Sequence, residues 1–209
     1  MMTLRDRKRH AVRAGISEVA QELFVSKGYE ATTIDEIAAA AGMSRRTFFR
    51  YFASKEDVLT GRFELVADDM VVALEERRAS ESAWDSLRHA FDPLINYYRD
   101  PHRRERDAVT WLLIETNQDL FASYLVKLDD MKERLVGVLV ERAVKNNGHE
   151  PIDNHLIRAL VGAAIECLLA SFHAVGPEYD VEVVAARLDD LMRKMRPGVA
   201  GEVSFTEAF

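Results

Sequence analysis

Three arginines and a threonine lie close together in residues 44–52, which read Ser-Arg-Arg-Thr-Phe-Phe-Arg-Tyr-Phe. A guanidinium group can donate two parallel hydrogen bonds to a guanine edge, and a threonine can bond a base or touch a thymine methyl. The side chains expected to reach base edges or phosphates are Arg45, Arg46, Thr47 and Arg50. This concentration of residue types indicates contact with double-stranded nucleic acid.

Aromatic residues divide the same segment into two faces. Phe48 and Phe52 are four positions apart, so they share one side of a helix and are expected to pack inward. Arg45, Phe49 and Tyr51 then point elsewhere. Residues 44–52 are therefore predicted to form one helix with an apolar inner face and a polar outer face.

The flanks of this segment carry groups that bind anions. Thr33 at one predicted helix N-terminus, and Ser54 and Lys55 at another, supply backbone N–H groups, hydroxyls and a cation, which together suit a phosphate. A basic arm is expected before the first helix and consists of Arg5, Arg7, Lys8 and Arg9. The arm could follow a phosphate backbone, enter a minor groove or be a solvated run of charge.

Four helices would position these residues. Apolar side chains at three- and four-residue spacing predict a first helix through residues 12–24, which Gly28 ends. A capping-box pattern at Thr33 starts a second helix that stops before Gly42, and a capping pattern at Ser54 opens a fourth helix over 55–75. The helices over 33–41 and 44–52 have the dimensions of a helix-turn-helix, whose second helix enters the major groove.

Charge is segregated along the 209 residues. The net charge is −7, but residues 1–56 hold 10 Lys and Arg against 7 Asp and Glu, while the remainder holds 18 against 28. A basic head on an acidic body favours phosphate contact by the head alone. The charged N-terminus and the absence of an uninterrupted apolar run of about 20 residues predict a cytoplasmic protein without a membrane span.

The rest of the chain has a helical pattern. Turn signals separate segments of roughly 15–30 residues, too long for strands, and predict an all-α body. Residues 156–172 are apolar around most of the helix circumference, so two neighbours must cover them. The second neighbour is either another subunit, which Gly162 would allow to approach closely, or another part of a monomer.

Aromatic and ionisable residues in the body are candidates for a small-molecule site. Helical bundles place such pockets between helices lined by aromatic side chains, and a buried polar group needs a partner that a ligand can supply. The residues chosen on this basis are Phe91, Tyr98, Trp111, Glu115, Phe121, Tyr124, Glu166 and His173. Plain core packing is the alternative for the aromatic residues, and a structural hydrogen bond or an exposed face is the alternative for the polar ones.

Six short stretches within residues 10–60 form a specific pattern in a fixed register: 20–24 (AQELF), 27–29 (KGY), 32–38 (TTIDEIA), 41–44 (AGMS), 51–52 (YF) and 54–59 (SKEDVL). Through these stretches residues 10–60 closely resemble the TetR family of transcriptional regulators. This resemblance implies a three-helix DNA-binding domain, a helical ligand-binding and dimerisation body, and repression relieved by a small molecule. The positions it carries over as DNA contacts are Thr33, Ser44, Thr47, Phe49, Tyr51 and Lys55.

Two positions depart from the family pattern. Arg46 stands where the family commonly has glycine, and Phe49 stands where it commonly has tyrosine. The first change adds a cation, and the second removes a hydroxyl that could bond a phosphate. Operator preference is therefore less transferable from the family than the fold.

The domain boundaries expected on this basis are a helix-turn-helix DNA-binding domain over residues 1–56, a ligand-binding and dimerisation domain over 57–196, and a loose tail over 197–209. The predicted function is a homodimeric repressor that leaves a palindromic operator in double-stranded DNA when a small, largely apolar effector binds the body. No cofactor is expected.

Other classes of function are less well supported. The six histidines show no HExxH or His-Cys spacing for a metal, and no phosphate loop or nucleophile elbow is present, which argues against a metal site and against an enzyme. A helical small-molecule-binding adaptor without DNA binding is the alternative, and a salt titration of DNA binding would discriminate between the two.

Overall fold

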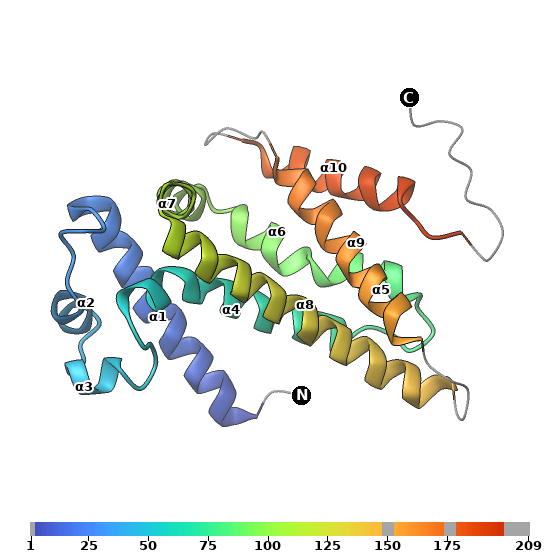
Figure 1. The fold of residues 1–209 in the computed structure, drawn as a ribbon, viewed down its shortest axis with the longest axis horizontal. Helices are drawn as coiled ribbons and strands as arrows, with labels where there is room; N and C mark the ends of the chain where they lie inside the picture. The colour runs from blue at the N-terminus through green and yellow to red at the C-terminus, as the bar shows by residue number, and fades with distance from the viewer. Residues whose placement is uncertain (1–2, 148–152, 174–178, 199–209) are drawn as a thin grey trace.

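The computed structural model describes residues 3–147, 153–173 and 179–198, and these ranges form helices without strands, which confirms the all-α prediction (Figure 1). The helices are α1 (Leu4–Lys27), α2 (Ile34–Ala40), α3 (Arg45–Phe48), α4 (Lys55–Glu75), α5 (Ala83–Ala90), α6 (Asp92–Tyr98), α7 (Pro101–Thr116), α8 (Gln118–Asn147), α9 (Asn154–Phe172) and α10 (Val181–Lys194). The expected tail over 197–209 lies outside the described residues except for its first two positions.

The first three helices gather at one end of the molecule (Figure 1). Their apolar faces form an N-terminal core that includes Ile16 and Phe24 of α1, Ile37 of α2 and the phenylalanines at 48 and 52. This core also takes in Ile114 of α7 and Leu120 and Tyr124 of α8. The head is thus packed directly onto the body rather than joined to it by a free linker.

The first helix begins earlier than predicted, because the basic residues at 5, 7, 8 and 9 are helical rather than an arm. Thr3 caps α1, and its Oγ1 accepts from Asp6 N at 3.2 Å. Asp6 Oδ2 in turn accepts from Thr3 N at 3.1 Å, which completes a capping box. The spacing Thr3-x-x-Asp6 was the signal in the sequence that could have placed this start.

The third helix ends earlier than predicted. Ser44 caps it, but α3 stops at Phe48 and residues 49–51 form turns. The hydrogen bonds from Arg50 N to Thr47 O (3.1 Å) and from Tyr51 N to Phe48 O (2.8 Å) each span three residues, so the backbone tightens after one α-helical turn. Its direction is still fixed, because Phe48 and Phe52 are 0% and 1% exposed, as their spacing predicted.

The fourth helix has the predicted bounds and joins the head to the body. It runs without interruption through the expected boundary between residues 56 and 57, and Val58 and Leu59 pack in the N-terminal core. Further along, Ala67, Met70 and Leu74 pack in a second core with residues of α5, α6, α8, α9 and α10. α4 and α8 lie side by side along the middle of the molecule (Figure 1). The domain boundary itself stays a prediction.

Two breaks in the body were not predicted. The chain leaves α5 at Phe91 and re-enters a helix at Asp92-Pro93, and it leaves α7 at Asn117 before α8. Pro93 is accommodated in the first turn of α6, where no intrahelical N–H bond is needed. Asn117 Oδ1 accepts from Asp119 N and Leu120 N at 3.0 and 3.1 Å, so its side chain caps α8.

Helix α9 contains the apolar segment singled out in the sequence. By length and composition it is the one described helix that could cross a membrane, but core helices meet the same criterion, and α9 packs against α5, α8 and α10. Only 33% of its 18-residue apolar stretch is buried within the chain. The apolar helix therefore gives no indication of a membrane protein, and it leaves apolar surface open.

Candidate nucleic-acid interface

The outer face of α3 presents cations to solvent. Arg46 and Arg50 are exposed, and neither guanidinium group has an ion-pair or hydrogen-bond partner within the described ranges. Arg45 is also exposed but is held locally: its Nη1 lies 2.9 Å from Asp35 Oδ2 of α2, and its guanidinium lies 5.6 Å from the centre of the Phe49 ring. The three arginines can approach a duplex without uncovering any core.

Hydroxyl groups order the start of the same helix. Ser44 Oγ accepts from Thr47 N at 3.1 Å and lies 2.9 Å from Thr47 Oγ1. Both residues border the exposed surface, so each hydroxyl keeps a lone pair or proton for another partner. Phe49, 44% exposed, offers an apolar contact instead of the phenol common in the family.

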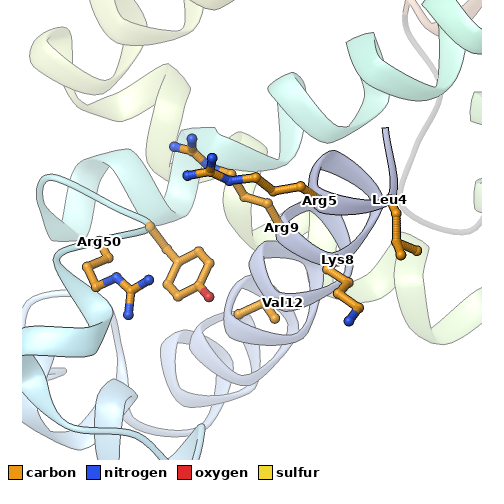
Figure 2. A pocket seen from close by; sticks show the side chains of 7 residues that line it. Leu4, Arg5, Lys8, Arg9, Val12 and Arg50 are labelled. Atoms are coloured by element: carbon orange, nitrogen blue, oxygen red, sulfur yellow. The ribbon is translucent and has the colours of Figure 1, made fainter. Parts of the chain in front are cut away.

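A second basic surface lies between α1 and the turn after α3. Figure 2 shows Arg50 on one side of a hollow and the side chains at 5, 8 and 9 of α1 on the other. The hollow has a volume of about 850 Å³, and Leu4, Val12 and Tyr51 complete its lining. Four cations around one concave surface favour a phosphate backbone. This arrangement depends on α1 beginning at Leu4, whereas the sequence pattern predicted that these cations form an arm before the first helix.

Thr33 and Lys55 mark the N-termini of α2 and α4, as expected, and the structure gives each an internal role. Thr33 Oγ1 accepts from Glu36 N at 3.3 Å in a capping box. Lys55 Nζ donates to Tyr29 O at 2.9 Å and Thr32 O at 3.3 Å, so the ammonium ties the α1–α2 loop to α4. One of its three N–H groups remains for a phosphate.

The loop that Lys55 holds is reinforced by two carboxylates. Tyr29 Oη donates to Glu56 Oε1 at 3.0 Å, and burial and this carboxylate raise the pKa of Tyr29. Lys27 bonds Glu36 directly, and together with the Thr33 backbone N–H and hydroxyl it lowers the pKa of Glu36 to about 2. The head is thus internally tied around the N-terminal end of α2.

Polar contacts also join α1 to α4. Arg13 Nη2 lies 2.5 Å from Glu64 Oε2, and the Arg13 guanidinium lies 4.7 Å from the centre of the Phe52 ring. His10 Nδ1 lies 3.1 Å from Asp68 Oδ2, and this hydrogen bond raises the pKa of His10. A shift of α4 must therefore move α1 or break these contacts.

The body contains a cavity of about 780 Å³ beside α4. Five of the eight ligand candidates from the sequence line it: Tyr98, Trp111, Glu115, Tyr124 and His173. The other three lie elsewhere. Phe91 is 0% exposed in the body core, Phe121 is 45% exposed on α8, and Glu166 is exposed on α9.

Two ionisable residues in the cavity wall were missed in the sequence. Arg62 of α4 forms an ion pair with Asp107 of α7, and the side chains are 7% and 2% exposed. Arg62 Nη2 donates to Tyr98 Oη at 2.6 Å, and Asp107 Oδ1 accepts from Gln21 Nε2 of α1 at 3.0 Å. Arg62 follows Leu59 by three residues and precedes Val66 by four, so an arginine within the apolar stripe of α4 was the available signal.

Other chemistry finds little support in the described ranges. No group of three or more His, Cys, Asp or Glu side chains there could hold a metal ion. Cys167 is free and buried, and burial raises the pKa of its thiol, which disfavours the reactive thiolate.

Known proteins resemble this chain at the head and along most of its length. The family model described as "Bacterial regulatory proteins, tetR family" matches residues 16–60. The HTH-type transcriptional regulator TcmR of Streptomyces glaucescens is 29% identical over 200 residues, covering 93% of this chain and 87% of that protein. The putative mycofactocin biosynthesis transcriptional regulator MftR of Mycobacterium tuberculosis is 38% identical over 84 residues, covering 40% of this chain and 42% of that protein.

A solved structure shares the fold. The putative TetR-family transcriptional regulator from Mesorhizobium loti has a TM-score of 0.53 at 19% identity, covering 88% of this chain and 95% of that one. These relatives are regulators rather than enzymes.

Proposed function

This chain is a DNA-binding transcriptional regulator of the TetR family, and we propose that it is a homodimeric repressor released from a pseudo-palindromic operator by a small, largely apolar molecule. In this proposal the two α3 helices occupy successive major grooves about 34–36 Å apart. Its site of action is then the cytoplasm, where the chromosome of a bacterium lies.

The observation that carries the DNA contact is the pair of basic surfaces on either side of Arg50. On one side, α3 offers Arg45, Arg46 and Thr47 to base edges. On the other, the hollow lined by α1 offers cations to the phosphates. We infer that the first surface reads sequence, and that the second, with Tyr51, Thr33 and Lys55, sets position and affinity.

The open apolar surface of the body supports the dimer. Leu156 of α9 is 57% exposed and Val183 of α10 is 54% exposed, and much of α9 is uncovered within one chain. A second subunit that covers this surface would also present two heads to a two-fold symmetric operator. Light scattering of the purified chain should give twice the mass of 23.7 kDa.

The position of the cavity supports release by a ligand. Arg62, Phe63, Val66 and Met70 of α4 line it, and the same helix carries Val58 and Leu59 into the N-terminal core. A ligand that prefers a body conformation with displaced heads must lower the affinity for the operator. Bound operator must lower the affinity for the ligand by the same factor.

The proposal is tested by selecting operator fragments with the purified protein and measuring variant affinities on selected and random DNA. Arg46→Ala or Thr47→Ala should lose about 1–3 kcal/mol and relax specificity if these side chains read bases. Arg9→Ala should weaken both kinds of DNA evenly and reduce the salt dependence. Lys145→Ala, an exposed cation near the far end of α8, is the matched control and should change neither.

The outcome also separates the two classes of function. Failure to bind any DNA at low salt would contradict the proposal and leave the helical small-molecule-binding adaptor. An even loss for every variant would contradict the division of the two basic surfaces.

A further inference from the structure

The lining of the cavity beside α4 is mainly apolar and aromatic, and its ionisable members are Arg62, Arg104, Asp107, Glu115, Lys127 and His173. Arg62 and Asp107 line it and are 93% and 98% buried by side chain. Within the ranges that the structure describes, Arg62 Nε and Asp107 Oδ2 have no hydrogen-bond partner, although both atoms are buried. A buried donor and a buried acceptor without partners are costly, so their presence at a cavity wall indicates a site for a ligand that satisfies them.

Charge balance restricts what that ligand group can be. Arg62 and Asp107 already neutralise each other as an ion pair, so an anionic or a cationic group placed against this pair would add an uncompensated buried charge. The other two basic side chains of the lining that are partly buried are engaged elsewhere: Lys127 forms ion pairs with Asp57 and Glu64, and Arg104 donates to Tyr98 O. A neutral hydroxyl fits both needs, because its oxygen accepts from an arginine N–H while its proton is donated to a carboxylate oxygen.

The remaining lining describes the rest of the ligand. Tyr98 packs against Phe172 and Tyr179 with ring centres 5.4 and 6.4 Å apart, and Trp111 packs edge-on against Tyr124 at 5.0 Å. These five rings all line the cavity. Such walls favour an apolar, ring-containing body.

We propose that the effector is a neutral hydroxylated molecule, a phenol or an alcohol on an apolar body, whose hydroxyl bridges Arg62 and Asp107. This inference rests on the proposed function for its biological meaning, but the binding site can be tested without DNA.

The test uses matched probes on two scaffolds and calorimetric titration of the full chain at neutral pH. The aromatic set is 2-naphthol, naphthalene and 2-naphthoate, and the aliphatic pair is 1-decanol and decanoate. On at least one scaffold, the hydroxylated probe should bind about tenfold more tightly than its carboxylate, and 2-naphthol more tightly than naphthalene. No binding by either alcohol, or equal binding of alcohol and carboxylate on both scaffolds, would overturn the proposal.

Asp107→Asn provides a sharper test, because it removes the negative charge and leaves Arg62 uncompensated. The carboxylate should then gain at least about tenfold relative to the alcohol. Glu105→Gln is the matched control, because Glu105 is an exposed carboxylate of the same helix that does not line the cavity, and the wild-type order should persist. An unchanged preference in a folded Asp107→Asn protein would contradict the proposal, and the wild-type comparison decides alone if that variant does not fold.

Operator affinity measured with saturating 2-naphthol separates this inference from the function on which it rests. A probe that binds as described but leaves operator affinity unchanged would refute release by this ligand and retain the hydroxyl site. Release of the operator by probes that bind equally well as alcohol and carboxylate would refute the hydroxyl site and retain the proposed function.

Discussion

Gly61 of α4 packs against Phe52 at the end of residues 44–52, and we expect Gly61→Ala to loosen those residues. A Cβ at position 61 would stand 2.6 Å from Cε1 of Phe52 and 3.3 Å from Nη2 of Arg13. The Phe52 ring is 1% exposed, so it cannot give way without disturbing the N-terminal core. Overpacking of this kind costs about 1–3 kcal/mol.

An opposing effect must be subtracted, because alanine is a better helix former than glycine by about 1 kcal/mol. Gly15→Ala in α1 isolates that effect: an added Cβ there meets nothing within 4 Å, so the variant should gain stability. The two variants share the propensity gain, so their difference in unfolding free energy should equal the packing cost of about 1–3 kcal/mol.

Urea unfolding of both variants measures this difference, and operator affinity reports its effect on α3. Gly61→Ala should be less stable than Gly15→Ala and should bind the operator more weakly than wild type. Equal stabilisation of both variants would refute the claim that Phe52 is held rigidly beneath α4.

Three further predictions concern the head. Asp68 raises the folded-state pKa of His10 above 6.5, so the stability that this contact adds is complete below pH 6.5 and is lost as the pH rises through the folded-state value. In urea unfolding, the stability difference between wild type and His10→Gln should therefore shrink between about pH 5.5 and pH 8.5. A difference that grows with pH would contradict the contact. Glu36 has a pKa of about 2 beside Lys27, so the stability that its carboxylate contributes is complete above pH 4.5 and is lost as the pH falls through about 2. An NMR titration that returned a pKa of 4.5 or higher for Glu36 would count against the cap. Phe48→Ala should cost about 3–5 kcal/mol and weaken operator binding, whereas a loss below about 1 kcal/mol would show that the inner face of α3 is not buried as described.

Local signals in the sequence were sufficient for much of the head. Thr33 and Ser54 each start a helix at the predicted place, because an N-cap side chain bonds the backbone only three residues away. Phe48 and Phe52 are buried as their spacing predicted. The early end of α3 could not be foreseen in the same way, because it depends on tertiary packing that places Phe48 and Phe52 in a core with residues far along the chain.

The candidate cavity was harder to predict, because it depends on contacts between distant parts of the chain. Tyr98, Trp111 and Tyr124 were chosen for their rings and do line it. Arg62 and Asp107 were overlooked, since nothing local shows that two charged residues 45 positions apart neutralise each other. Phe91 is a phenylalanine like Phe63 and Phe172, which line the cavity, and only the packing of the body core places it elsewhere.

The contact of Arg45 with Asp35 and the Phe49 ring affects how this regulator would search along DNA. An exposed ion pair of this kind contributes only about 0–1 kcal/mol, so a guanine edge can displace the carboxylate at little cost. Until then the guanidinium is already confined to a narrow range of rotamers, so less side-chain entropy remains to be lost on recognition. Asp35 would also repel phosphates near this arginine, which leaves indiscriminate attraction to the backbone mainly to the cations of α1.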